Sequence, residues 1–333
     1  MVKINTLNIS PPLINSSCAW ASDLAQLTAL YESPFTGAVT TRTATLDGFQ
    51  EGPSHTVAFT TAESLASINS YGYSPHPLTQ YLTWIKALLT QPGPTKPFII
   101  SITSSSAPTL RTMVAAIQTL RTELGASLAP AIAIELNTSC PNIPGAPPTA
   151  YAISALRPLL AVLCEAHTHD PSLTLGLKLP PFVHRAQFVA LLDGLVDLCP
   201  PDSDACPFAF FTCTNTLGNS LLFADQCTPP DRDNATTLEH EPKSEPNFAV
   251  PTALGGLAGE PLHALALGNV YTFAQLLQAP EYARLRGVAL VGVGGVTSRA
   301  AAERMRRAGA CVVGCATFFG REGVRAFEIL SQG

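Results

Sequence analysis

The sequence lacks the features that mark secreted, membrane-spanning, metal-binding or nucleic-acid-binding proteins. Its nine cysteines are scattered and form no C-x-x-C pair, which argues against a disulfide framework or a zinc site. No apolar stretch approaches about 18 residues, and the N-terminal MVKINTLNIS has no apolar signal region. The net charge of -5 is not gathered into a basic stripe. We therefore expect a cytoplasmic protein that binds no membrane, no nucleic acid and no metal.

The signatures of several hydrolase classes are missing too. There is no Gly-x-Ser-x-Gly elbow and no Ser-His-Asp spacing. The positions that follow the apolar runs hold almost no carboxylates and no clustered histidines. This composition argues against two-carboxylate glycoside chemistry and against metal-assisted hydrolysis.

What the chain does have is an alternation of short apolar runs with longer amphipathic stretches. Its 333 residues are 46% hydrophobic, enough to bury a large core. Near-continuous apolar strands between helices predict a parallel sheet, and eight of them predict a (β/α)8 TIM barrel. We interpret residues 1–333 as a single domain. The runs lie at 37–41, 64–68, 97–102, 131–136, 173–179, 208–214, 288–293 and 310–315, and the helical patterns at 78–89, 109–124, 150–166, 185–198, 298–308 and 323–330.

One segment interrupts this rhythm between the sixth and seventh strands. Residues 215–287 include a polar run at 225–247 that has no periodicity. We interpret it as an excursion over the barrel mouth, with residues 225–250 as a polar insertion that is a candidate for mobility. A linker between two domains is the alternative, but the strand pattern resumes after it.

Amides dominate the positions that follow the predicted strands. Ligands of such barrels bind at the C-terminal ends of the strands, so these positions carry most information. Asparagine offers both donors and acceptors, which suits a flat, polar ligand. The residues there are Arg42, Thr43, Asn69, those at 137–142, Lys178, Asn215, Thr216, Gly294, Gly295, Ala316 and Thr317.

Three of these features each allow two interpretations. The Gly294-Gly295 turn after the seventh strand indicates a phosphate site, or merely a tight turn. Lys178, between leucines, either reaches solvent or meets a flavin ring that gains negative charge on reduction. Cys140 is either a small buried hydrophobic residue or a thiolate that removes a proton from carbon.

Taken together, collinear motifs over nearly the whole chain resemble the class 1 dihydroorotate dehydrogenases, especially the fumarate-linked class 1A branch. A cysteine at the base position is specific to class 1, because class 2 enzymes carry serine there. The matching segments are GAVTTRTATL at 37, SINSYG at 67, ELNTSCPNIPG at 135, GLKLPPF at 176, TNTLGN at 214, GGLAG at 255, GVGGV at 292 and REG at 321.

The resemblance implies an FMN-dependent homodimer of pyrimidine biosynthesis that oxidises dihydroorotate and uses fumarate as oxidant. Cys140 would take the proton from carbon 5 of dihydroorotate while hydride from carbon 6 passes to FMN. The implied substrate-binding residues are Arg42, Asn69, Tyr71, Gly72, Asn137, Asn142, Asn215 and Thr216. The implied FMN-binding residues are Ser17, Arg42, Thr43, Asn137, Lys178, Thr214, Gly259, Gly294, Gly295, Ala316 and Thr317.

Departures from the family pattern lie near the implied substrate. Arg42 stands where the family usually has lysine, and Pro251 where this branch has a second lysine. Arginine keeps the charge but is wider and planar. Tyr71 and Tyr73 replace smaller or aliphatic residues. These changes motivate two alternatives: a paralogous FMN oxidoreductase acting on another cyclic amide or unsaturated substrate, and a non-catalytic flavin- or pyrimidine-binding protein, against which the retained Cys140 argues.

Overall fold

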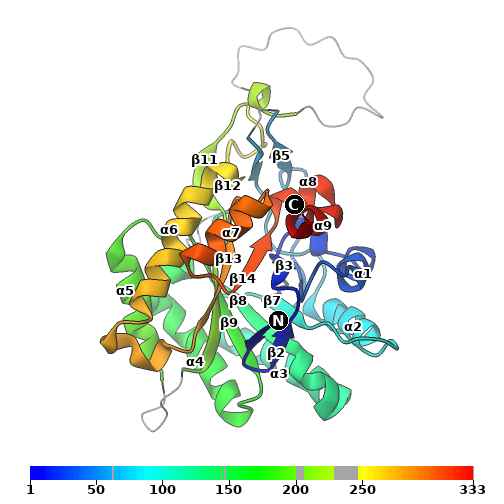
Figure 1. The fold of residues 1–333 in the computed structure, drawn as a ribbon, viewed down its shortest axis with the longest axis vertical. Coiled ribbons are helices and arrows are strands. Elements are labelled where there is room, and N and C mark those ends of the chain that lie inside the picture. The colour runs from blue at the N-terminus through cyan, green and yellow to red at the C-terminus, as the bar shows by residue number, and fades with distance from the viewer. Residues whose placement is uncertain (62–63, 144, 146–147, 200–205, 229–246, 333) are drawn as a thin grey trace.

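The structure, a computed structural model, describes residues 1–61, 64–143, 145, 148–199, 206–228 and 247–332. An eight-stranded parallel sheet curls into a nearly closed barrel at its centre (Figure 1). A parallel bridge between Ile14 and Ala38 links the first and last strands of the sheet, so the predicted (β/α)8 fold is confirmed. In sheet order the strands are β3 (Leu13–Asn15), β14 (Val312–Cys315), β13 (Ala289–Val293), β10 (Phe208–Cys213), β9 (Thr174–Leu179), β8 (Ile132–Asn137), β7 (Phe98–Ile102) and β4 (Val39–Thr40).

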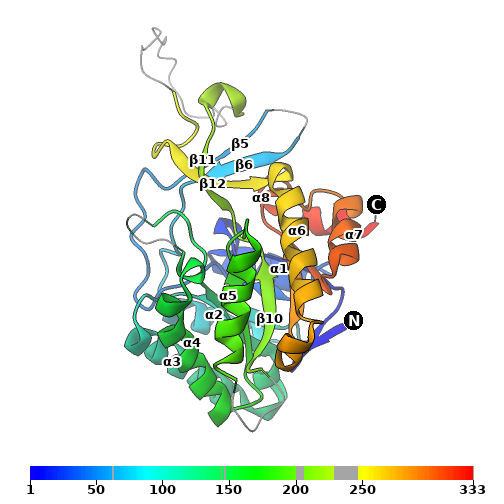
Figure 2. The same cartoon turned by 90° about the vertical axis from the view of Figure 1, so that its left-hand side faces the viewer.

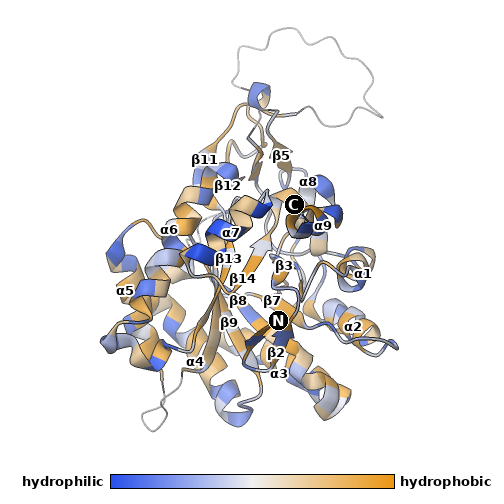
Figure 3. Cartoon of the chain, viewed as in Figure 1, coloured by the Kyte–Doolittle hydropathy of each residue, from blue (hydrophilic) through white to orange (hydrophobic). Residues whose placement is uncertain are grey.

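Helices surround the barrel because each buries one apolar face against the strands. In the helix Leu78–Leu89 the buried side chains Leu78, Tyr81, Ile85 and Leu88 recur every three to four residues. Figure 3 shows hydrophobic residues along the central strands and hydrophilic ones on outer helical turns. The helices are α1 (Leu24–Glu32), α2 (Leu78–Leu89), α3 (Ala107–Leu128), α4 (Ile153–His169), α5 (Arg185–Val196), α6 (Glu260–Leu276), α7 (Arg299–Ala308), α8 (Thr317–Glu322) and α9 (Arg325–Gln332).

Side chains fill the N-terminal half of the barrel interior. Ile99, Phe210 and Val291 belong to one buried cluster inside the strands. The hairpin of β1 (Val2–Ile4) and β2 (Leu7–Ile9) packs apolar residues into the same cluster. The hairpin therefore closes this end, and the opposite end, where the strands finish, is left for a ligand.

A second sheet lies beyond the C-terminal ends of the barrel strands, at the top of Figure 2. It has four antiparallel strands in the order β11 (Leu217–Leu221), β12 (Leu254–Gly259), β6 (Ala66–Asn69) and β5 (Val57–Phe59). Two of them, β11 and β12, come from the segment between the sixth and seventh barrel strands. The predicted excursion is thus confirmed, whereas most of the predicted 225–250 insertion lies outside the described residues.

One predicted barrel strand is wrong. Residues 64–68 do not enter the barrel, because Ala66–Asn69 pairs with β5 and β12 in the antiparallel sheet. The missing barrel strand is β3, Leu13–Asn15, only three residues long and preceded by two prolines. Such a short run gives no period, so hydrophobic patterning could not find it.

Helix α6 lies in the segment at 215–287, between β12 and β13, and is not among the helical patterns predicted from the sequence. Its buried side chains include Leu262, Ala266 and Phe273, at helical spacing. Apolar residues also lie on its outer face, where Tyr271 is exposed. Apolar residues on both faces hide the period that marks a half-buried helix.

Replacing Gly176 by alanine should destabilise the barrel by about 1–3 kcal/mol. A methyl group on Gly176, in β9, would lie 2.2 Å from the ring of Phe210, which is fully buried. Gly268, in the middle of α6, has nothing within 4 Å of the same position, so Gly268→Ala is the matched control. Gly268→Ala should stabilise the protein by about 0.5–1 kcal/mol. Urea unfolding gives the free energy of unfolding of both variants, and equal changes in the two would contradict the packing explanation.

Candidate active site

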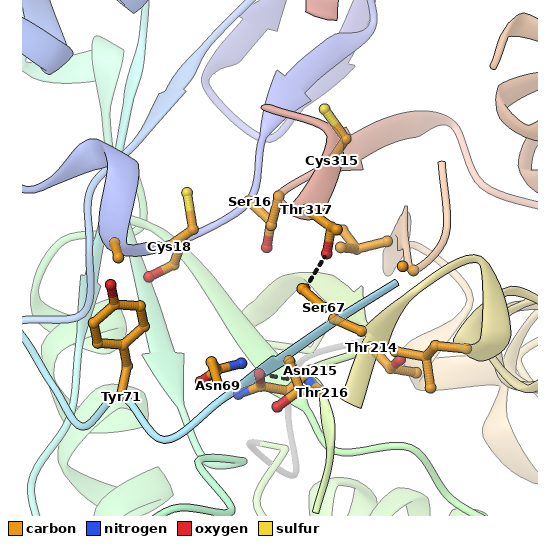
Figure 4. Close-up of a pocket in the computed structure, with 18 of the residues that line it drawn as sticks. Ser16, Cys18, Ser67, Asn69, Tyr71, Thr214, Asn215, Thr216, Cys315 and Thr317 are labelled. Atoms are coloured by element: carbon orange, nitrogen blue, oxygen red, sulfur yellow. Dashed lines mark hydrogen bonds between the residues drawn. The ribbon is translucent and has the colours of Figure 1, made fainter. Parts of the chain in front are cut away.

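A pocket of about 1020 Å³, counted out to its open mouth, lies between the barrel mouth and the antiparallel sheet. Figure 4 shows side chains from both sheets pointing into it. All the residues predicted to bind substrate or cofactor line it: Ser17, Arg42, Thr43, Asn69, Tyr71, Gly72, Asn137, Cys140, Asn142, Lys178, Thr214, Asn215, Thr216, Gly259, Gly294, Gly295, Ala316 and Thr317.

Asn137 and Asn215 are held in fixed orientations at the barrel side of the pocket. Asn137 Nδ2 donates to Thr43 Oγ1 at 2.9 Å, and its Oδ1 accepts from the backbone N–H of Ser139 at 3.1 Å. The Ser139 hydroxyl also donates to this Oδ1, at 2.8 Å, and accepts from Asn215 Nδ2 at 2.9 Å. Asn215 Oδ1 accepts from the N–H of Thr216 at 2.8 Å. Both amides are thereby preorganised for a ligand.

Asn142 connects the turn after β8, which also holds Cys140, to the antiparallel sheet. Its Nδ2 lies 3.0 Å from Asn69 Oδ1 and 2.9 Å from the carbonyl oxygen of Tyr71. Asn69 in turn donates to the carbonyl of Gly256 at 3.2 Å. These bonds hold the turn after β8 against β6 and β12, across the pocket from the barrel.

Cys140 lies at the start of this turn, half-buried and facing the pocket. Burial raises the pKa of its thiol, while a hydrogen bond from Asn142 and the positive charges of Lys178 and Arg42 lower it. Tyr73 lies beside it, and burial together with Cys140 raises the pKa of that phenol. Cys140 is therefore protonated at neutral pH, with positive groups near enough to favour its ionisation.

Lys178 is buried at the end of β9, with only 4% of its surface exposed, so it does not reach solvent. Its Nζ donates to the carbonyl of Ser17 at 3.1 Å. Burial lowers the pKa of Lys178, and the carboxylate of Glu135 opposes that shift. A buried lysine of this kind gains stability when a negatively charged group enters the pocket.

Arg42 is buried and already paired. Its Nη2 forms a 2.5 Å ion pair with Glu51 Oε1, and the guanidinium lies 5.1 Å from the ring centroid of Tyr71. Glu51 belongs to the segment between β4 and β5, which also places Phe49 against Gly72. A methyl group on Gly72 would come within 2.3 Å of the Phe49 ring, which explains the glycine.

The glycine turn after β13 packs against α6. Gly294 and Gly295 have φ angles of +130° and +64°, and added methyl groups would lie 2.6 Å from Ala266 and His263 respectively. Packing and backbone conformation thus already require both glycines. Nearby, the hydroxyls of Ser67 and Thr317 are 3.0 Å apart. Figure 4 marks this hydrogen bond with a dashed line.

Several residues that shape the site were given no role in the sequence analysis. Ser139 connects two predicted amides, and its signal was its place inside the same polar turn as Cys140. Glu51 and Phe49 lie in a loop without any pattern that could have indicated them. Cys18 and Ser16 line the pocket beside Ser17.

Two hydroxyl groups in the pocket wall indicate that the pocket takes a polar ligand. The hydroxyl oxygens of Ser16 and Thr214 are buried in its wall without a hydrogen-bond partner. Buried polar groups of this kind are normally satisfied, so a polar ligand is expected there. Together with the buried Lys178, they suit a planar group with several acceptors that becomes anionic. In the part of the chain that the structure describes, no group of three or more histidine, cysteine, aspartate or glutamate side chains gathers to hold a metal ion.

The fold and the site define a barrel enzyme with a preformed pocket for a polar ring at its strand ends. The family model for dihydroorotate dehydrogenase matches residues 1–222. The chain belongs to the dihydroorotate dehydrogenase family and is an oxidoreductase of the type that acts on a CH–CH bond, so the predicted family and enzyme class are confirmed.

The similar proteins include several from streptococci. One from Streptococcus equi subsp. equi is 30% identical over 334 residues, which is 99% of this chain and 90% of that protein. Another, from Streptococcus pneumoniae serotype 4, is 30% identical over 300 residues, 89% of this chain and 79% of its own. Both are named as dihydroorotate dehydrogenase A (fumarate). Within the described ranges, no helix has the length and apolar character that a membrane span needs.

Proposed function

We propose that the protein oxidises (S)-dihydroorotate to orotate in pyrimidine biosynthesis, with FMN as cofactor and fumarate as electron acceptor. The observation that carries this is the meeting of a thiol, a buried lysine and four asparagine amides in one pocket. The relatives are named for the same reaction and the same acceptor. A cytoplasmic homodimer is part of the proposal, as is a single FMN-binding domain over residues 1–333 with an insertion at 225–250.

FMN, when bound, supplies the hydride acceptor. Lys178 would meet its ring, because this is the one buried lysine among the described residues that line the pocket. Thr214 would donate its unpaired hydroxyl. Gly294, Gly295, Ala316 and Thr317 would surround the ribityl and phosphate portion, and Ser17, Thr43 and Gly259 would also contact FMN.

Cys140 would act as the base, and the amides would orient the substrate. The thiol faces the pocket from a turn that Asn142 fixes to Asn69. Asn137 and Asn215 each keep one amide hydrogen free of the bonds described above, so they can bind carbonyl or carboxylate oxygens. Holding the ring in one orientation brings its acidic carbon to the thiolate.

A second candidate function has one observation in its favour. Arg42, Tyr71 and Tyr73 differ from the family pattern and lie together at one wall, where Glu51 neutralises Arg42. A pocket whose arginine is already paired attracts an anionic ring less. A paralogous FMN oxidoreductase acting on another cyclic amide or unsaturated compound is therefore the alternative.

Anaerobic titration of the purified protein separates these functions. We expect bound flavin to bleach with dihydroorotate and to recolour with fumarate rather than with NAD or quinone. Flavin that stays oxidised with dihydroorotate but bleaches with another dihydropyrimidine would favour the paralogue. Bound flavin that no donor reduces would favour a non-catalytic binding protein. Light scattering of the same sample gives its molar mass and so tests whether the protein is a homodimer.

Replacing Glu51 by glutamine should strengthen the binding of orotate severalfold at low ionic strength. The change removes the carboxylate that pairs with Arg42 and leaves a full positive charge near the substrate. Uncharged dihydrouracil should bind as before, and added salt should reduce the gain. Flavin absorbance changes report both affinities, and an equal change for the two ligands would contradict the electrostatic explanation.

A further inference from the structure

Glu135 is a buried carboxylate that does not line the pocket, and the proposed reaction does not use it. It lies on β8, two residues before Asn137, and only 2% of its surface is exposed. It accepts hydrogen bonds from the hydroxyl groups of Ser101 at 3.1 Å and Thr212 at 2.6 Å. A buried carboxylate is costly, so its presence under the pocket calls for an explanation.

The hydroxyl groups beside Glu135 form a chain that leads to the pocket wall. Thr43 Oγ1 lies 3.0 Å from Ser101 Oγ and 3.0 Å from Ser17 Oγ. It also accepts from Asn137 Nδ2 at 2.9 Å. Ser101 and Thr43 are at most 4% exposed, so bulk water does not reach these contacts.

Counting hydrogens fixes the direction of every bond in this chain. A carboxylate only accepts, so the single hydroxyl hydrogen of Ser101 points to Glu135. The contact between Ser101 and Thr43 must then use the hydrogen of Thr43. That leaves the contact between Thr43 and Ser17 to use the hydrogen of Ser17.

The other end of the network agrees with this count. The backbone N–H of Ser139 can only donate, so the atom of Asn137 that faces it is the oxygen. The amide nitrogen of Asn137 therefore faces Thr43 as a donor, as the count requires. Ser17 consequently turns its hydrogen away from the cavity and keeps lone pairs as acceptors, while Asn137 keeps a free donor.

We propose that Glu135 is a positioning residue: through Ser101 and Thr43 it directs the hydroxyl hydrogen of Ser17 toward Thr43, so that Ser17 offers the flavin an acceptor rather than a donor. The role rests on the proposed FMN site and adds a residue outside it. Glu135 acts on Ser17 through the hydroxyl of Ser101, so this effect depends on an acceptor atom at that place, whereas its negative charge acts separately on Lys178.

FMN affinity of the full chain, stripped of flavin and retitrated by fluorescence, tests this. Glu135→Met and Ser101→Ala should each raise the FMN dissociation constant about tenfold, the effect of one unsatisfied buried group. The FMN affinity of the double variant should also fall only about tenfold, because both changes break the same chain of hydroxyl hydrogen bonds. The FMN dissociation constant of Glu135→Gln should stay within about threefold of the wild-type value, since the glutamine oxygen can still accept a hydrogen bond from Ser101.

Two results would overturn the proposal. If Glu135→Gln loses as much affinity as Glu135→Met, the charge acts through space. If the double variant loses about a hundredfold, the two residues act independently. Circular dichroism of each variant establishes that it is folded, and the visible spectrum of bound flavin should shift in Ser101→Ala but not in Glu135→Gln. A wild type that binds FMN but is not reduced by dihydroorotate would refute the proposed function alone, whereas one that binds no FMN refutes both.

Discussion

Replacing Cys140 by alanine should slow the reduction of bound flavin by dihydroorotate about 10²–10⁴-fold, the usual contribution of a general base. The thiol faces the pocket from the turn after β8, and alanine has no group that can take the proton. Affinity for FMN should change little, because Lys178, Thr214 and the glycine turn lie on other strands. Anaerobic stopped-flow spectroscopy measures the rate, and fluorescence titration measures the affinity.

The control is Cys164→Ser, a thiol on α4 outside the pocket. It is partly buried against the core, but it does not line the pocket, so the rate of this variant should stay within about threefold of the wild type. The rate of flavin reduction in Cys140→Ser should lie between those of Cys140→Ala and the wild type, since a hydroxyl can accept a proton but ionises less readily than a thiol. A rate for Cys140→Ala close to that of the wild type would show that another group is the base.

The rate of flavin reduction should also rise about tenfold for each pH unit through the neutral range. Only the thiolate removes a proton, and burial raises the pKa of the Cys140 thiol. Below that pKa the thiolate fraction grows tenfold per unit, so the rate increases as the pH rises and levels off above the pKa. Between roughly pH 6 and pH 8 the rate should therefore change about a hundredfold.

Orotate binding, measured over the same pH range, provides the comparison. The amides of Asn137 and Asn215 do not titrate, so the orotate affinity should vary much less than the rate. A rate that stays flat from roughly pH 6 to pH 8 would mean that the base is already ionised there, contrary to the burial of Cys140.

The fold could be predicted wherever the strands are long enough to carry a pattern. Runs such as 131–136 and 173–179 match β8 and β9 closely, because every residue of both strands is buried. The three-residue β3 has no such pattern, and the run at 64–68 is apolar for another reason. As β6, it lies between two other strands and covers the pocket.

The site could be predicted from motifs, whereas its connections could not. The motifs pointed to Cys140, Lys178 and the asparagines, and the structure brings them into one pocket. Whether those residues play their proposed roles stays a prediction. The pairing of Arg42 with Glu51 joins residues nine positions apart through a loop, and spacing along a chain does not show which way a loop folds.

The antiparallel sheet that covers the barrel mouth has a consequence for how this enzyme can diverge. Lys178 lies on a barrel strand, and Thr214 and the glycine turn directly follow two others, so the eight-stranded sheet enforces their geometry. Asn69, Tyr71 and Tyr73 belong to the cover, which meets the barrel through side-chain bonds such as those of Asn142. Substitutions in the cover can accumulate without disturbing the packing of the barrel. Selection can therefore alter the proposed substrate side of the pocket separately from the proposed cofactor side, and we expect such divergence to accumulate first at Tyr71 and Tyr73.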